Sequence, residues 1–148
     1  MLFWLGAYLV IIDQLAYLGV SSFVGQWIAH PLRGLAPIPA AIVLSIWYFL
    51  LVFAFASLST HPLAFAGFFM VAGEQLGCPK RLIMALLSYF TALGCCVNNF
   101  STGVYNIYVR LGHAERKGWL VSGFLVGLLH MGVHFTVGLG WWKLLGWF

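Results

Sequence analysis

Two short polar runs interrupt an otherwise apolar sequence, and they hold the side chains whose types and spacing could do chemistry. The first polar run is Ser57-Leu58-Ser59-Thr60-His61-Pro62, and the second covers residues 94–103, with two asparagines, two hydroxyls and a glycine at each end. In lipid, such groups are costly unless they face protein, water or a ligand. The positive end of a helix binds carboxylates and phosphates. If each run precedes a helix, the pair predicts an anion site at membrane depth.

The residues within each run fit that arrangement. Thr60 or His61 is expected to cap the helix after the first polar run, with Pro62 at its first helical position, where a missing N–H costs nothing. Ser101 or Thr102 is expected to cap a helix that starts near Gly103. The helices before the runs would end in free carbonyls, which suit a hard cation such as sodium, and paired interrupted segments are typical of transporter sites. The alternative is a kinked helix whose polar groups satisfy each other, and composition alone does not separate the two.

Other polar residues give weaker indications. His130 and His134 are four apart on one helix face, but no third metal ligand is apparent, which favours packing or interhelical hydrogen bonds. His61, beside three hydroxyls, could be either a substrate contact or a structural cap. The sequence shows no nucleophile–base pair, phosphate loop or nucleic-acid module, so we expect neither an enzyme nor a nucleic-acid binder. Buried, reduced thiols are expected at Cys78, Cys95 and Cys96.

The composition places these runs in a membrane. Only 7% of the residues are charged against 63% hydrophobic, with seven basic and three acidic side chains and a net charge of +4. A soluble domain has about a quarter of its residues charged, so this chain is predicted to be an integral, all-α membrane protein. Its few basic residues are best interpreted as juxtamembrane anchors, and its C-terminal tryptophans as part of an interfacial aromatic belt.

The charged residues divide the chain into the elements that must position the polar runs. Because residues 63–73 offer only about 11 residues, or roughly 17 Å of helix, the second arm after the first polar run is too short to cross. A re-entrant hairpin, with its polar tip inside the membrane, therefore fits better than two spans. Glycines at 123, 127, 132, 138 and 140 would give the last helix small faces for close packing. The predicted single membrane domain comprises a span at 2–20, an amphipathic interfacial helix at 21–34, a re-entrant hairpin at 37–73, a centrally broken helix at 82–111 with halves near 82–94 and 103–111, and a final span at 118–142.

The order of these motifs resembles a known family. The motifs are DQLAYLG at 13–19, an interfacial helix, FASLSTH at 55–61, NNFSTG at 98–103 and WWKLLG at 141–146. This series resembles the C-terminal third of the divalent anion/sodium symporter family, closest to its 2-oxoglutarate/malate translocator branch. The resemblance covers nearly the whole chain, and five motifs in order are more specific than any one of them.

The resemblance implies a dicarboxylate carrier, driven by sodium or by exchange, that works by an elevator motion. Ser57 and Ser59 match the hydroxyls of the family's second hairpin tip, although Ser59 stands where threonine is usual and Leu58 replaces an amide. His61 matches a histidine that often follows in this branch. In the loop of the broken helix, Ser101, Thr102 and Gly103 match, whereas Asn98 and Asn99 replace a Thr-His pair.

Two sets of site residues follow from the resemblance, with no cofactor besides a coupling ion. The dicarboxylate anion would contact Ser57, Ser59, Thr60, His61, Asn98, Asn99, Ser101 and Thr102. Sodium would be held, mainly through backbone atoms, at Ser57, Ser59, Gly94, Asn98 and Gly103.

Members of this family run to roughly three times this length and are built as inverted repeats, so this chain would carry half of an elevator-type transporter. We expect a fragment, or a chain that pairs with a separate polypeptide carrying the N-terminal half, with a homodimer in the full-length family. The alternative is a small non-transporting membrane subunit or a degenerate transporter fragment. The expected location is a cell membrane, by default a bacterial inner membrane, with an organelle envelope as the alternative. Residues 110–117 would be cytoplasmic and the C-terminus outside.

Overall fold

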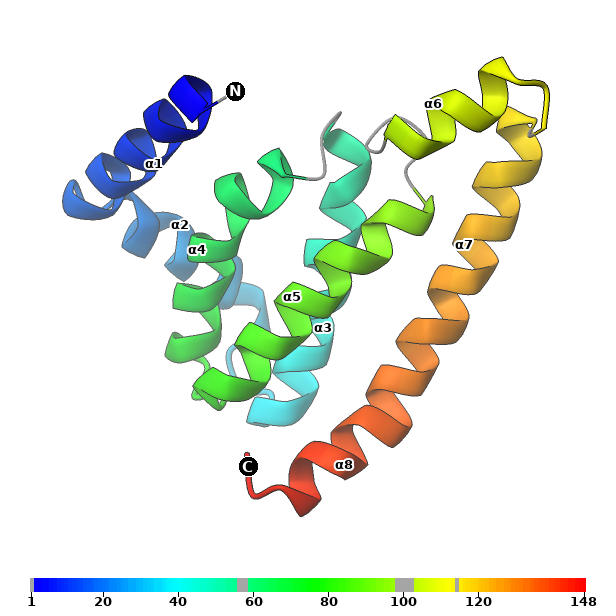
Figure 1. Ribbon diagram of the computed structural model, residues 1–148. Coiled ribbons are helices and arrows are strands. Elements are labelled where there is room, and N and C mark those ends of the chain that lie inside the picture. Colours follow the sequence, from blue (N-terminus) through cyan, green and yellow to red (C-terminus); the bar gives the residue numbers. More distant parts are fainter. Residues whose placement is uncertain (1, 56–58, 98–102, 114) are drawn as a thin grey trace.

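The structure is a computed structural model, which describes residues 2–55, 59–97, 103–113 and 115–148. All regular elements in these ranges are helical (Figure 1). The helices are α1 (Leu2–Tyr17), α2 (Val20–Ala29), α3 (Pro37–Leu50), α4 (Thr60–Gln75), α5 (Lys80–Val97), α6 (Gly103–Arg110), α7 (Arg116–Val133) and α8 (Leu139–Leu144). Shorter turns join them: 3-10 turns at His30–Leu32 and Leu51–Ala54, and a π-helical turn at His134–Gly138.

Among the described residues, two segments are long and apolar enough to cross a membrane. They are Pro37–Ala54, with 18 residues and a mean hydropathy of 2.1, and Arg116–Leu144, with 29 residues and a mean hydropathy of 1.7. A third arises if α1 and α2 are counted as one bent span. Because each spanning helix needs about 20 apolar residues, these segments support the prediction of an all-helical membrane protein.

The first two helices meet at a sharp bend. Gly19 has a φ of 75°, and the helix axes on its two sides differ by 75°. A left-handed backbone is easy only for glycine, which is why the bend falls at this residue. The bend coincides with the predicted boundary between the span at 2–20 and the interfacial helix at 21–34. How either helix lies relative to the bilayer stays a prediction.

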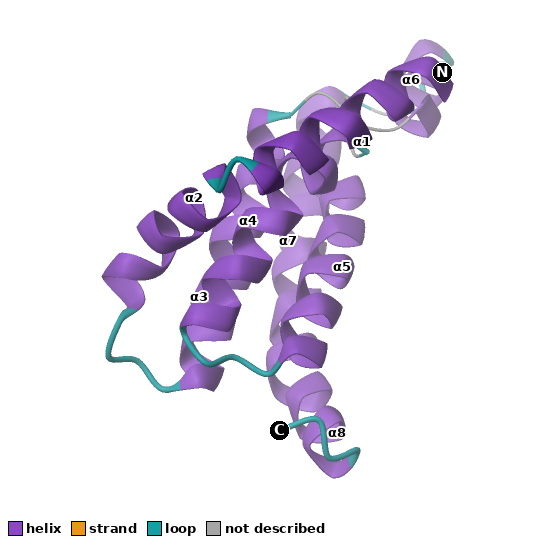
Figure 2. Cartoon of the chain, turned by 90° about the vertical axis from the view of Figure 1, so that its left-hand side faces the viewer, coloured by secondary structure: helices purple, strands orange, loops and turns teal. Residues whose placement is uncertain are grey.

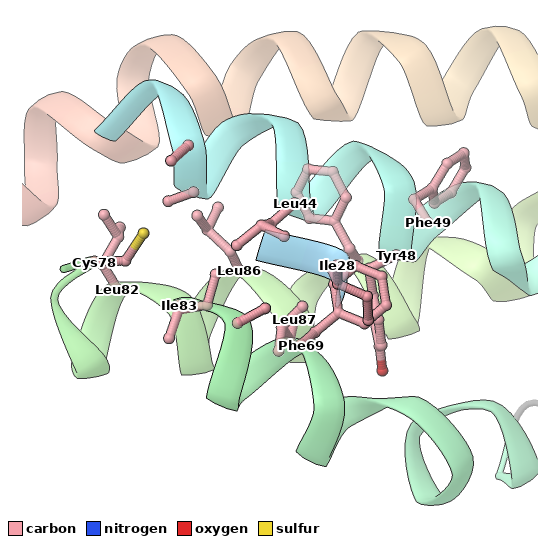
Figure 3. Packing of buried hydrophobic residues seen from close by; sticks show 14 of the residues in the cluster. Ile28, Leu44, Tyr48, Phe49, Phe69, Cys78, Leu82, Ile83, Leu86 and Leu87 are labelled. Carbon is pink, nitrogen blue, oxygen red and sulfur yellow. The ribbon is translucent and has the colours of Figure 1, made fainter. Parts of the chain in front are cut away.

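Helices α3, α4 and α5 run side by side and form the centre of the molecule (Figure 2). Their buried side chains make one cluster (Figure 3). Aromatic rings meet edge to face within it, with centroids of Tyr48 and Phe69 5.3 Å apart and those of Phe49 and Phe90 6.2 Å apart. The largest side chains that are fully buried in this cluster are Tyr48, Phe49, Phe69, Phe90, Leu44, Leu82, Ile83 and Leu86.

Close approach at glycines holds the outer helices against this centre. A Cβ atom at Gly25 of α2 would lie 2.6 Å from a methyl carbon of Val71 on α4, and one at Gly127 of α7 would lie 3.1 Å from Val97 of α5. Lipid tails are as apolar as leucine, so helix association in a membrane depends on such tight packing. The expected small face of the last helix is thus found at Gly127. At Gly132 and Gly140 no atom of the described residues lies within 4 Å of the Cβ position, so close packing at these two glycines stays a prediction.

The predicted hairpin corresponds to Pro37–Ala54 followed by α4. The second arm is longer than the predicted 11 residues, because α4 has 16 residues, or roughly 24 Å of helix. Its length is still below the 30 Å of a typical hydrocarbon core. The re-entrant geometry itself stays a prediction, since the turn at residues 56–58 lies outside the described residues.

The predicted broken helix corresponds to α5 and α6. Helix α5 ends at Val97, three residues beyond the predicted end at Gly94, and α6 begins at Gly103 as expected. Residues 98–102 between them lie outside the described residues, so the break stays a prediction. The last segment is helical from Arg116 to Leu144, slightly longer than the predicted 118–142.

The loop between α4 and α5 is tied to the start of α3. The buried Cys78 thiol donates a hydrogen bond to the carbonyl oxygen of Pro37 at 3.2 Å. Burial raises the pKa of this thiol, because the charged thiolate loses its hydration. The expectation of a buried, reduced cysteine is therefore confirmed at Cys78.

Candidate functional site

The helix ends that flank the two polar runs lie at one end of the molecule. In Figure 1, the 3-10 turn after α3, the start of α4, the end of α5 and the start of α6 are all in the upper half of the view. Chain direction explains this. Helices α3 and α5 run toward that end, and the helices after them start there. The fold thus brings the flanks of the first polar run and of the second together.

A direct contact joins these flanks. Val52, in the 3-10 turn before the first polar run, is buried against Gly94 in the last turn of α5. A Cβ atom at Gly94 would lie 2.7 Å from one Val52 methyl carbon, closer than real Cβ contacts allow, and 3.2 Å from the other, which is tight. Only glycine therefore permits this approach. Gly94 also lies among the last four residues of α5, whose carbonyls lack an intrahelical partner.

Helix α4 begins with its first N–H groups uncapped by the residue before it. Ser59 occupies the N-cap position with a helical backbone (φ −72°, ψ −33°), and its side chain makes no capping hydrogen bond. The prediction that Thr60 or His61 caps this helix is wrong, and Pro62 falls at the third helical position rather than the first. The helical backbone of Ser59 explains the error, since winding starts before the expected cap. Ser59 is exposed and Thr60 is half-buried.

His61 is fully buried, and it reaches across to the other arm of the hairpin. Its Nε2 lies 3.0 Å from the carbonyl oxygen of Tyr48, so Nε2 carries the proton and donates it. The two rings are 4.3 Å apart at their centroids, and the Phe55 ring is 5.7 Å away. His61 is therefore not a helix cap, and its role as a substrate contact stays a prediction.

The other ring nitrogen of His61 has an unusual environment. Nδ1 is buried and has no hydrogen-bond partner within the part of the chain that the structure describes. Buried polar atoms are nearly always paired, and leaving one unpaired costs about 1–3 kcal/mol. Because of this cost, His61 is the residue of the first polar run whose presence most needs a functional explanation.

Tyr48 connects this contact to α5. Thr91 Oγ1 donates to the Leu87 carbonyl oxygen at 2.9 Å, so its single hydrogen is used, and the Tyr48 hydroxyl donates to Thr91 Oγ1 at 2.8 Å. One residue of α3 thus bonds to both α4 and α5. Sequence reasoning missed Tyr48 and Thr91. A signal was present, because a phenol inside a charge-free apolar run usually finds a partner when buried.

Cavities among the described residues lie near this contact. A cavity of about 420 Å³ between α3, α4 and α5 is lined by the hydroxyl-bearing Tyr48, Ser88 and Thr91 together with apolar side chains. Thr60 lines a second one of about 320 Å³ between α1 and α4. A larger apolar one of about 590 Å³, between α2, α3 and α4, contains none of the predicted site residues.

The remaining predicted site residues divide into two groups. Gly103 is the first residue of α6, so it stands at a helix start as expected. Ser57, Asn98, Asn99, Ser101 and Thr102 lie outside the described residues.

His130 of α7 and His134 of the π-helical turn that follows it both bond to backbone carbonyls of the preceding helical turn. His130 Nδ1 donates to the Val126 carbonyl oxygen at 2.9 Å, and His134 Nδ1 donates to the carbonyl oxygen of His130 at 2.8 Å. The ring of Tyr89 on α5 lies 5.0 Å from that of His134. These contacts agree with the packing interpretation. Within the described residues, no group of three metal-ligating side chains forms.

The whole chain, residues 1–148, matches the model of the family described as the sodium:sulfate symporter transmembrane region. The chain belongs to this family. The match confirms the resemblance to the divalent anion/sodium symporters and identifies the protein as a membrane protein of a transporter family.

Relatives of this symporter-family chain include named dicarboxylate carriers. It is 28% identical over 145 residues to dicarboxylate transporter 2, chloroplastic, of Spinacia oleracea, covering 97% of this chain and 26% of the relative. It is 26% identical over 143 residues to the putative malate transporter YflS of Bacillus subtilis, covering 97% and 30%. It is 24% identical over 140 residues to the L-tartrate/succinate antiporter of Escherichia coli, covering 94% and 29%. No solved structure matches the chain.

The symporter-family chain thus spans about a quarter to a third of the length of these curated relatives.

Proposed function

We propose that this chain supplies one half of the binding site of a dicarboxylate transporter of the 2-oxoglutarate/malate type, driven by sodium or by exchange. The observation that carries the proposal is the Val52–Gly94 contact, which holds the flanks of the two polar runs together. The names of the relatives support the substrate class, since each refers to dicarboxylate, malate or tartrate and succinate. No catalytic role is proposed.

The chemistry follows from the helix ends. The start of α4 presents N–H groups at Thr60, His61 and Leu63, whereas Pro62 has none, and the helix dipole places roughly half a positive charge there. One carboxylate of the substrate would bind at this point, with Ser57 and Ser59 donating hydroxyl hydrogens. The carbonyls of the last turn of α5, including Gly94, would face a sodium ion, as at other helix C-termini in transporters.

The rest of the site would come from a partner. In this proposal, a polypeptide with the N-terminal half of the family's inverted repeat provides the second carboxylate contact and completes the sodium site. The assembly would work as a homodimer in a bacterial inner membrane, alternating access by an elevator motion.

The proposal is tested by uptake of labelled malate and 2-oxoglutarate into proteoliposomes. Vesicles contain this chain alone, or the chain with a polypeptide that supplies the rest of the family's length. Uptake is expected only for the pair, because one half offers a single carboxylate contact. An inward sodium gradient and preloaded unlabelled dicarboxylate are applied separately, and the condition that accelerates uptake identifies the driving force. If the pair takes up neither anion under either condition, the proposal is wrong.

A further inference from the structure

The contact between His61 and Tyr48 joins the two arms of the hairpin next to the proposed anion site. Tyr48 lies in the last turn of α3, before the winding changes to a 3-10 turn at Leu51. His61 is the second residue of α4. The Nε2–H···O=C bond of 3.0 Å therefore spans from one arm to the start of the other. The bond thus connects the second residue of α4 to the backbone of α3.

The surroundings of the imidazole ring limit its movement. Tyr48 packs on the ring at a centroid distance of 4.3 Å, and Phe55 and Phe65 lie at 5.7 Å and 6.3 Å. None of these neighbours is charged, and the side chain is 0% exposed. Tyr48 is itself fixed in the core (Figure 3), and its hydroxyl bonds to Thr91 of α5 at 2.8 Å. The imidazole ring thus packs on a side chain that is itself fully buried among core residues.

We propose that His61 is a positioning residue, which fixes the start of α4 for anion binding through its Nε2–H bond to the Tyr48 carbonyl. The inference rests on the proposed function, because the group that His61 positions is the proposed carboxylate site. His61 acts through the backbone of α4 and does not itself touch the substrate. The positioning role thus belongs to Nε2, and Nδ1 has no role in substrate contact.

A pair of substitutions separates the two nitrogens. The amide nitrogen of glutamine reaches the position of Nε2, whereas that of asparagine reaches only the position of Nδ1. His61→Gln is expected to keep the apparent KM for dicarboxylate within about twofold of the wild type, because a single neutral hydrogen bond is preserved. His61→Asn is expected to raise it about tenfold, as loss of that bond would. Tyr48→Phe is the matched control, since it keeps the ring and the carbonyl and changes only the hydroxyl.

A second readout does not depend on transport. A cysteine placed at the exposed Ser59 reports how firmly the start of α4 is held. Its modification by a water-soluble thiol reagent is expected to be about tenfold faster with His61→Asn than with His61→Gln or Tyr48→Phe. A helix start that has lost its hydrogen bond to α3 frays more often. If the wild-type pair shows no uptake, the proposed function is wrong. The modification rate still tests whether the bond from His61 to the Tyr48 carbonyl holds the start of α4.

The unsubstituted protein gives a third test that no folding defect can affect. Nitrogen-15 NMR of labelled histidine reports the tautomer of each ring, and the structure requires the Nε2–H form at His61. Three results overturn the inference. They are the Nδ1–H form at His61, a wild-type KM with His61→Asn but not with His61→Gln, or equal KM values and equal modification rates for all variants. A wild-type KM with His61→Asn would assign Nδ1 to the substrate instead.

Discussion

Gly94→Ala is expected to destabilise the protein by about 1–3 kcal/mol and to lower dicarboxylate uptake well below the wild-type level. The new methyl group would stand 2.7 Å from Cγ2 and 3.2 Å from Cγ1 of Val52, so α5 and the 3-10 turn must separate. Because this contact holds the flanks of the two polar runs together, the separation would widen the proposed site. Thermal unfolding in detergent measures the first effect, and uptake by the reconstituted pair measures the second.

A second substitution should reverse the effect. Val52→Ala removes both methyl carbons that the new side chain meets and leaves Val52 Cβ, which is at an ordinary distance of 3.5 Å. The double variant Gly94→Ala with Val52→Ala is therefore expected to recover most of the lost stability and uptake. Gly132→Ala on α7 is the control, since no described atom lies within 4 Å of its Cβ position. The contact has no functional role if Gly94→Ala behaves like Gly132→Ala.

Replacing Ser57 and Ser59 together by alanine is expected to reduce the apparent affinity for dicarboxylate by 100-fold or more. A hydrogen bond to a charged group is worth about 1.5–3 kcal/mol, which is about tenfold or more for each hydroxyl. The hydroxyl of Ser59 is not used to cap α4, so it is available to a ligand. Initial uptake rates over a range of malate concentrations measure the change.

Ser122→Ala is the control for that measurement. Ser122 is an exposed serine on α7, outside both polar runs, whose hydroxyl donates to the Gly118 carbonyl oxygen of its own helix at 2.7 Å. Its loss should leave uptake unchanged. If the double variant at 57 and 59 also leaves every measured property unchanged, the two hydroxyls contribute nothing to binding. That outcome would favour the alternative of a non-transporting subunit or a degenerate transporter.

The helical membrane fold follows from the sequence because hydropathy and charge spacing are local properties. The bend near Gly19 and the start of α6 at Gly103 were predictable, since in each case the polar or glycine residues mark a boundary. The start of α4 was not. The capping rules select a hydroxyl or histidine just before Pro62, but Ser59 already has a helical backbone, so the helix begins earlier.

The contacts of the candidate site could not be predicted, because they join residues far apart in the sequence. The Tyr48 hydroxyl donates to Thr91, and His61 donates to the backbone carbonyl of Tyr48. Because the second bond uses the backbone, the identity of residue 48 does not predict it. Gly94 was predicted as a backbone ligand for sodium, but its closeness to Val52 depends on how α5 crosses the 3-10 turn. Periodicity indicates which face of a helix is apolar, not which residue it meets.

Protection of a cysteine by substrate tests whether the start of α4 binds a dicarboxylate. Cysteines are placed separately at Ser59, beside the start of α4, and at Gln75, exposed at the far end of the same helix. Each is modified by a water-soluble thiol reagent in the reconstituted pair, and the rate for protein without the added cysteine is subtracted. Malate or 2-oxoglutarate is predicted to slow modification at position 59 and to leave position 75 unaffected. Equal rates at position 59 with and without saturating dicarboxylate would contradict the account.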